Sequence, residues 1–169
     1  MATLPLLQLV LDEVQLPVLA AGGIGTARGV AAVLAAGAAG AWVGTAFLAC
    51  PEAEGSPAAR ERLLAADDVA TAYGRVFDVG QRLAWPPEYG GRALRNAFFD
   101  RWQGREDELA RDDAAYQELL AARAAHQLDV APVYAGQGAA LLNAERSAAE
   151  VVRSFAGAGE LLRRTAEHA

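Results

Sequence analysis

Residues 16–48 read LPVLAAGGIGTARGVAAVLAAGAAGAWVGTAFL and alternate short apolar runs with glycine turns. The first run, residues 17–21, is too short for a helix and stops at Gly22, where the backbone can take a positive φ without a Cβ clash. A second short run, residues 41–43, ends in the same way at Gly44. This pattern predicts a βαβ unit with parallel strands and a right-handed crossover.

The segment between the two runs carries the markers of a helix. Thr26 is a suitable N-cap, and Val30, Val33 and Leu34 follow it at helical spacing. Gly37 matches the left-handed residue that often ends a helix. The sequence therefore predicts a helix that begins after Thr26 and ends near Gly37.

Parallel strands that both end in glycine place free backbone N–H groups at one edge of the sheet, where they can bind an anion such as a phosphate. All 15 positively charged side chains are arginines. The absence of lysine excludes a Walker-type phosphate loop, a Schiff-base lysine and a pyridoxal site within these residues. The sequence also does not match the dinucleotide-binding motif G-x-G-x-x-G, because Gly29 lies four residues after Gly25 and the motif requires three.

The motifs AAGGIG-x-x-RG and VGTAF resemble the C-terminal barrel segment of the nitronate monooxygenases, formerly called 2-nitropropane dioxygenases. These are FMN enzymes on a TIM-barrel scaffold, and WPPEYGGRALRNAFFDRW and VYAGQGAALL also look like their C-terminal region. The resemblance implies an α/β fold, with the last two βα units of a (β/α)8 barrel in residues 1–55 and a mostly helical extension packing on the barrel in residues 56–169. A (β/α)8 barrel takes about 250 residues, so we do not expect a complete barrel within this chain.

The resemblance also implies a cofactor site. In the family the two glycine turns follow the seventh and eighth barrel strands and hold the FMN phosphate. Carried over by position, Ala21, Gly22 and Gly23 would hold one side of the phosphate, and Gly44 and Thr45 the other. This placement agrees with the general phosphate site of such barrels.

The catalytic histidine of the family lies N-terminal to the glycine turns, and no residue of this chain corresponds to it. We expect His126, in the helical stretch ELLAARAAHQ, and His168, next to last, to be surface or boundary residues, because neither has neighbours that would make it a base. The family often has methionine and arginine where this chain has Val43 and Ala46. Its chemistry toward substrate is therefore expected to differ.

Two further segments carry candidates for the substrate pocket. The loop at residues 85–91 is either a structural turn or a lid that brings Tyr89 and Arg92 to a ligand. The segment VYAGQG is either a simple turn between helices or a loop that returns Tyr134 and Gln137 to the mouth of the active site.

The resemblance implies an FMN-dependent oxidoreductase that converts alkyl nitronates and O2 into a carbonyl compound and nitrite, here represented by its phosphate-binding part. One alternative is an FMN-dependent enoyl reductase of the same barrel type, which would require NAD(P)H. A second alternative is a non-catalytic remnant or interaction module in which the glycine turns serve only tight packing.

The remaining helices are predicted from caps and periodicity. Ser56 and Pro57 begin a helix in SPAARERLLAADDVATAYG, and residues 107–127 form an amphipathic helix with a mixed polar face. Ser147 caps a terminal helix that is expected to dock on the barrel wall or on a partner subunit. A homodimer through the C-terminal helices is therefore possible.

Composition limits the class of protein. The net charge of −6 and pI of about 4.9 argue against nucleic-acid binding, which needs clustered positive charge. No run is apolar enough for a membrane span, and we expect a cytoplasmic protein. A single cysteine, Cys50, rules out an internal disulfide and a multi-cysteine metal site, so we expect a plain buried thiol and no metal.

Overall fold

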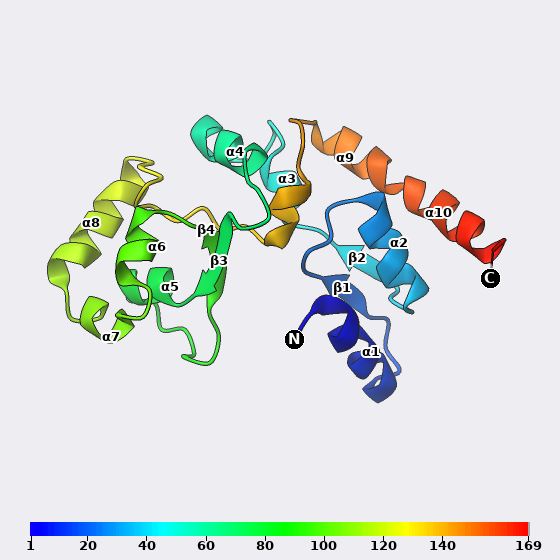
Figure 1. Ribbon diagram of the computed structural model, residues 1–169, viewed down its shortest axis with the longest axis horizontal. Coiled ribbons are helices and arrows are strands. Elements are labelled where there is room, and N and C mark those ends of the chain that lie inside the picture. Colours follow the sequence, from blue (N-terminus) through cyan, green and yellow to red (C-terminus); the bar gives the residue numbers. More distant parts are fainter. Residues whose placement is uncertain (169) are drawn as a thin grey trace.

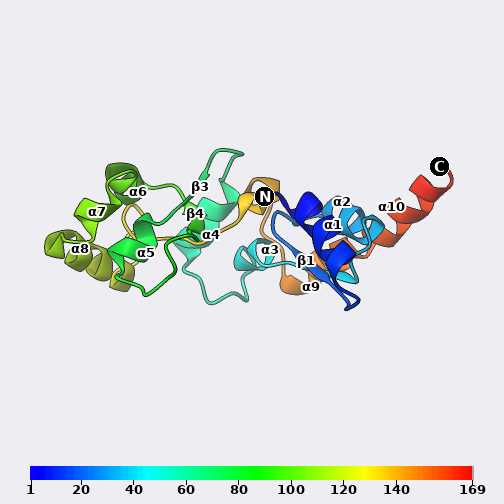
Figure 2. The same ribbon diagram turned by 90° about the horizontal axis from the view of Figure 1, so that it is seen from below.

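The computed structural model describes residues 1–168 and is elongated, with two bodies joined by a narrower middle (Figures 1 and 2). Along the chain, the N-terminal part holds α1 (Thr3–Glu13), β1 (Leu19–Ala21), α2 (Ala27–Ala35), β2 (Gly40–Trp42) and α3 (Thr45–Leu48). The middle of the chain holds α4 (Pro57–Leu64), β3 (Thr71–Gly74), α5 (Val76–Gly80), β4 (Gly91–Leu94), α6 (Ala97–Trp102), α7 (Glu106–Leu109) and α8 (Asp113–Ala124). The last segment holds the 3-10 helix η1 (Gln137–Leu141), α9 (Ala148–Phe155) and α10 (Gly157–Ala166).

The predicted βαβ unit is confirmed. Strands β1 and β2 are parallel, with Leu19 opposite Gly40 and Ala21 opposite Trp42. Helix α2 crosses between them. Thr26 caps it by accepting a 3.2 Å hydrogen bond from the N–H of Gly29. Gly37 has φ +100°, as the left-handed residue after the helix requires.

The two faces of this small sheet differ sharply. Ala20 is 4% exposed and packs with Leu7 of α1 and Val33 of α2. On the opposite face Leu19 is 53% exposed and Trp42 is 69% exposed. Within residues 1–168, β1 and β2 pair only with each other. The βαβ unit therefore covers its sheet with helices on one side and leaves an apolar face open on the other.

The extension is mostly helical, as predicted, but it also holds two short strands that the sequence did not predict. Strands β3 and β4 pair antiparallel, with Thr71 opposite Leu94 and Gly74 opposite Gly91. Sequence patterns missed these strands for two reasons. Each strand has only four residues, so neither shows a clear alternation of apolar and polar residues. The two partners also lie far apart in the chain, so no hairpin turn marks them. Trp85 and the residues up to Gly90 do form an irregular loop, as expected, but Gly91 begins β4.

Two predicted helices are interrupted. The amphipathic helix expected over residues 107–127 is divided into α7 and α8, because the Asp112 side chain accepts from the N–H of Ala115 and starts a new helix. The terminal helix begins as predicted, with Ser147 and Glu150 in a capping box, but breaks at Ala156 between α9 and α10. The helix that begins at Pro57 ends at Leu64.

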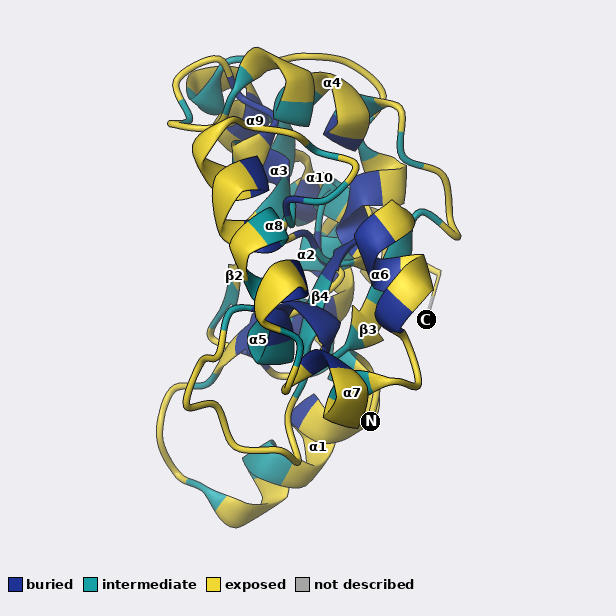
Figure 3. Cartoon of the chain, turned by 90° about the vertical axis from the view of Figure 1, so that its left-hand side faces the viewer, coloured by how far each residue is buried: buried dark blue, intermediate teal, exposed yellow. Residues whose placement is uncertain are grey.

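The lobe formed by β3, β4 and α5–α8 closes around its own core (Figure 3). Phe98 and Phe99 are each 1% exposed, and Leu119 of α8 is fully buried. The outer surface of α8 is exposed. After this lobe the chain turns back: η1 packs against α3 and α4, and α9 and α10 pack along α2.

Cys50, just after α3, is 2% exposed, which confirms the expected buried thiol. Burial raises the pKa of the Cys50 thiol, and the nearby Glu52 adds to this rise, so the thiol stays protonated. No helix among residues 1–168 is long and apolar enough to cross a membrane.

Candidate functional site

The two glycine turns lie side by side at the carboxyl edge of the β1–β2 sheet. The register places Ala21 opposite Trp42, so β1 and β2 end at the same level of the sheet. Gly22 and Gly23 follow with φ +110° and +72°, a conformation that L side chains rarely adopt. Gly44 precedes the first turn of α3. The structure thus brings together all five residues expected at the phosphate.

This edge is open and rich in hydrogen-bond donors. A Cβ atom added at Gly23 or at Gly44 would meet no atom within 4 Å. The N–H groups of Gly22, Gly23 and Gly44 donate to no acceptor in the part of the chain that the structure describes. Unpaired backbone donors in turns with room for a ligand at Gly23 and Gly44 are the features of an anion-binding site.

Thr3 fixes the other side of the first turn. Its hydroxyl donates to the carbonyl oxygen of Gly22 at 2.8 Å and lies 3.4 Å from that of Ala21. The carbonyl groups of the turn are therefore held toward α1. Sequence reasoning missed Thr3, because only the fold brings the start of α1 to a turn 19 residues later.

The segment around η1 reaches both turns. The N–H of Gly136 donates to the Thr45 hydroxyl oxygen at 3.0 Å. A Cβ atom on Gly138 would lie 3.7 Å from the backbone of Gly23. Gln137 lies between Gly136 and Gly138 in the chain, so its backbone is near both glycine turns, and its side chain is exposed.

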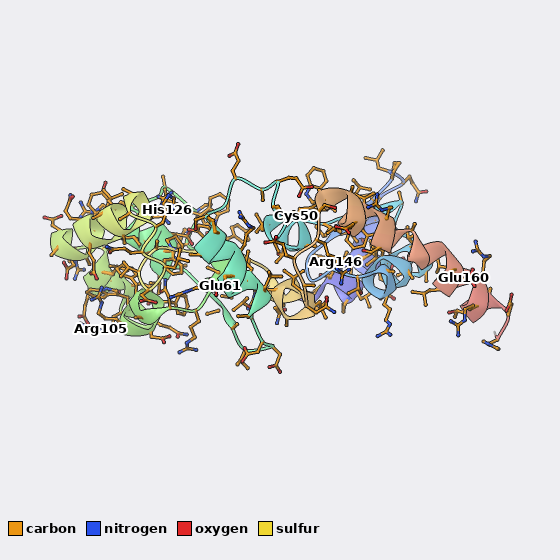
Figure 4. The ribbon with its side chains drawn as sticks, turned by 90° about the horizontal axis from the view of Figure 1, so that it is seen from above. Cys50, Glu61, Arg105, His126, Arg146 and Glu160 are labelled. Atoms are coloured by element: carbon orange, nitrogen blue, oxygen red, sulfur yellow. The ribbon has the colours of Figure 1, made fainter. Side chains whose placement is uncertain are left out.

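A pocket of about 250 Å³ adjoins the turns. The first turn of α2 lines it at Thr26 and Ala27, and α3 lines it at Ala46. Arg146 contributes the positive charge of its wall, and its guanidinium donates to the Asn143 side chain at 2.7 Å. No pattern in the sequence singled out Arg146, which reaches the first third of the chain only because the C-terminal segment turns back (Figure 4).

The other candidates for the substrate pocket lie away from the turns. Tyr134 packs its ring against Phe77 at 6.3 Å between centroids, and its hydroxyl accepts from Gln81 at 2.9 Å. Burial raises the pKa of Tyr134, so this phenol stays protonated at neutral pH. Tyr89 is 61% exposed in the loop before β4.

The loop that carries Tyr89 is fastened to the lobe. The N–H of Gly90 donates to the Tyr73 hydroxyl at 2.8 Å, and that of Gly91 to the Asp78 carboxylate at 3.3 Å. The Arg92 guanidinium donates to the Thr71 hydroxyl at 3.2 Å. These contacts favour a structural turn over a lid.

Both histidines are exposed, as expected, and neither lies at the glycine turns. The sequence suggested that His126 lies inside a helix, and this was wrong. It follows α8 and has φ +52°. His168 is the last residue that the structure describes. Neither is placed to act as a base at the candidate site.

Known proteins are similar to this chain in sequence and in fold. The model of the nitronate monooxygenase family matches residues 1–157. A nitronate monooxygenase of Pseudomonas aeruginosa is 37% identical over 160 residues, covering 90% of this chain and 42% of that protein. The structure of FabK from Thermotoga maritima matches with a TM-score of 0.81 and 26% identity, over all of this chain and 52% of that one.

A nitroalkane oxidase from Streptomyces ansochromogenes matches with a TM-score of 0.75 and 30% identity, over 98% of this chain and 45% of that one. The chain thus spans about half, or less, of the proteins that it matches. Since the family model matches most of its length, the chain belongs to the nitronate monooxygenase family.

Proposed function

We propose that this chain carries the flavin-phosphate site of an FMN-dependent oxidoreductase of the nitronate monooxygenase type. The observation that carries the proposal is the pair of glycine turns at one sheet edge, with donor groups at Gly22, Gly23 and Gly44 that have no acceptor among residues 1–168. Membership of the nitronate monooxygenase family supports the same function.

The residues at this edge suit a phosphate monoester. The open space over Gly23 and Gly44 would let its oxygens approach the backbone closely. The Thr45 hydroxyl oxygen accepts from Gly136, which leaves its own proton free to be donated to a phosphate oxygen. Arg146, in the wall of the adjoining pocket, would add positive charge.

When bound, FMN would supply the redox chemistry, with an alkyl nitronate and O2 as substrates and a carbonyl compound and nitrite as products. The residues of this chain would anchor the phosphate and thereby orient the rest of the cofactor. Gln137 would contact the cofactor or the substrate, which is supported by the contacts that its neighbours Gly136 and Gly138 make with the two turns. Neither His126 nor His168 has a role in this proposal.

A fluorescence titration of the purified chain with FMN tests the proposal, with nitrite release from an alkyl nitronate as the activity assay. We expect saturable quenching of FMN fluorescence, and its loss in Gly22→Asp and in Gly44→Asp, which place a carboxylate beside the phosphate. Absence of binding by the folded chain would overturn the proposal and favour a non-catalytic remnant.

The enoyl reductase alternative makes a different prediction in the same experiment. It requires NADH oxidation that depends on an enoyl thioester and no nitrite release from nitronates. The glycine turns serve either enzyme equally, because both would hold the same phosphate. The family match favours the nitronate monooxygenase reaction.

A further inference from the structure

A second pocket, of about 340 Å³, lies between the start of α4, the end of α8 and the strand-like segment after α8. Leu63, Leu128 and Val133 give it an apolar lining. Its volume falls in the range of about 300–1,000 Å³ typical of small-molecule sites. It shares no lining residue with the pocket beside the glycine turns.

The polar groups of this pocket are mostly hydrogen-bond donors. Arg123 and His126 line it from the end of α8, and Tyr134 lines it from the segment before η1. Glu54 is the acidic residue in the lining, and it comes from the loop before α4. The pocket therefore has a basic end at α8 and an apolar body.

Two of these donors, Arg123 and Tyr134, are held in place by hydrogen bonds to the Gln81 side chain. The Arg123 guanidinium donates to the Gln81 side-chain oxygen, and the amide nitrogen of Gln81 donates to the Tyr134 hydroxyl at 2.9 Å. Because the Tyr134 oxygen already accepts this bond, its own proton is free for a ligand. This chain of hydrogen bonds orients two donors before any ligand arrives.

The backbone at His126 is unusual. The N–H of Gln127 donates to the carbonyl of Ala122 at 2.9 Å, which is the pattern that closes a helix around a left-handed residue. Glycine is the favoured residue at that position, yet His126 occupies it with φ +52°. Both His126 and Arg123 line the pocket.

We propose that this pocket binds a small organic anion with an apolar body, such as a medium-chain carboxylate. The carboxylate would lie at Arg123, His126 and Tyr134, and the hydrocarbon chain would lie along Leu63, Leu128 and Val133. Arginine suits this role because its planar donors match a carboxylate and its charge is permanent. The site is independent of the proposed flavin site.

Isothermal titration calorimetry with octanoate tests the proposal, with 1-octanol as an uncharged probe of the same length. We expect saturable binding of octanoate and at least tenfold weaker binding of octanol. Arg123→Gln is expected to weaken octanoate binding at least tenfold. Arg111→Gln, on the same lobe but outside the pocket, is expected to bind octanoate like the unmodified chain.

His126→Gly separates a ligand contact from a structural role. We expect it to weaken octanoate binding while the thermal unfolding midpoint stays the same or rises, because glycine relieves the left-handed backbone. Gly44→Asp, which alters the flavin site, is expected to leave octanoate binding unchanged. Equal affinity for octanol and octanoate, unchanged affinity in His126→Gly, or weaker binding in Arg111→Gln would each overturn the proposal.

Discussion

The lobe of β3, β4 and α5–α8 and the βαβ unit of β1, α2 and β2 use their large side chains in opposite ways. In the lobe, Phe98 is 1% exposed and stacks near Phe77 at 6.2 Å between ring centroids. In the βαβ unit, Leu19 and Trp42 stand 53% and 69% exposed on the open face of the sheet. The lobe is organised around its own packing, whereas the βαβ unit presents an apolar face and a row of free backbone donors.

Glycines show the same difference. In the lobe, Gly90 has no side chain because a Cβ atom there would lie 2.7 Å from the carbonyl oxygen of Gly74. In the βαβ unit, a Cβ atom on Gly44 would meet nothing within 4 Å. Gly90 is required by a protein contact, and Gly44 is explained by the approach of a ligand. Experiments can separate these two roles.

The largest effect is expected at the core of the lobe. Phe98→Ala should lower the free energy of unfolding by about 3–5 kcal/mol, because it removes a buried ring and leaves a cavity. Trp42→Ala is the matched change on the open sheet face, and we expect a shift within about 0.5 kcal/mol. Urea denaturation measures both. Similar losses in the two variants would contradict the difference between the two regions.

Asn96 should come next. It is 8% exposed, accepts from the N–H of Phe99, and donates to the carbonyls of Leu128 and Ala131, each at 3.1 Å. Asn96→Ala should lower the free energy of unfolding by about 2–4 kcal/mol, because a helix cap is lost and the buried Ala131 carbonyl loses its donor, while the Leu128 carbonyl still accepts from Arg62. Exposed Asn143 provides the control, and Asn143→Ala should change stability by less than about 0.5 kcal/mol.

The two kinds of glycine give a third, smaller effect. Gly90→Ala should destabilise the fold by about 1–3 kcal/mol, because its methyl group meets the Gly74 carbonyl. Gly44 has a negative φ of −111° and open space around an added Cβ atom, so the unfolding free energy of Gly44→Ala should stay within about 0.5 kcal/mol of the unmodified chain. A Gly44→Ala variant as unstable as Gly90→Ala would mean that Gly44 serves packing.

The smallest effect concerns pH. Burial raises the pKa of Asp78, although the N–H of Gly91 and the charge of Arg75 oppose the rise. The folded state therefore holds this proton more strongly than the unfolded state. The resulting penalty is absent at low pH and grows as the pH rises from the ordinary aspartate value through the folded value.

Asp78→Asn removes this penalty and can still accept from Gly91. We expect the variant to gain stability over the unmodified chain at pH 7, by less than about 1 kcal/mol because Asp78 is partly exposed, and to show no gain at pH 3. Urea unfolding at the two pH values measures it. A loss of stability at pH 7 would show that the carboxylate charge helps the fold.

Local features of the fold were predictable from sequence, and contacts between distant segments were not. Thr26, Gly37 and the capping box at Ser147 could be predicted because each acts on its own helix end. The β3–β4 pair could not, since its strands are recognisable only once they are paired. At the site, the glycine turns were predicted from their spacing and the family resemblance. Thr3 and Arg146 were missed because only tertiary structure brings Thr3 to the first turn and Arg146 to the pocket beside the turns.

The central claim is that the glycine turns bind the phosphate of FMN, and a comparison of FMN with riboflavin tests it most directly. Both share the isoalloxazine, but only FMN carries the phosphate. We predict that the chain binds FMN at least tenfold more tightly than riboflavin, and that Gly44→Asp removes this difference while Gly90→Ala keeps it. Equal affinities for FMN and riboflavin in the unmodified, folded chain would contradict the account.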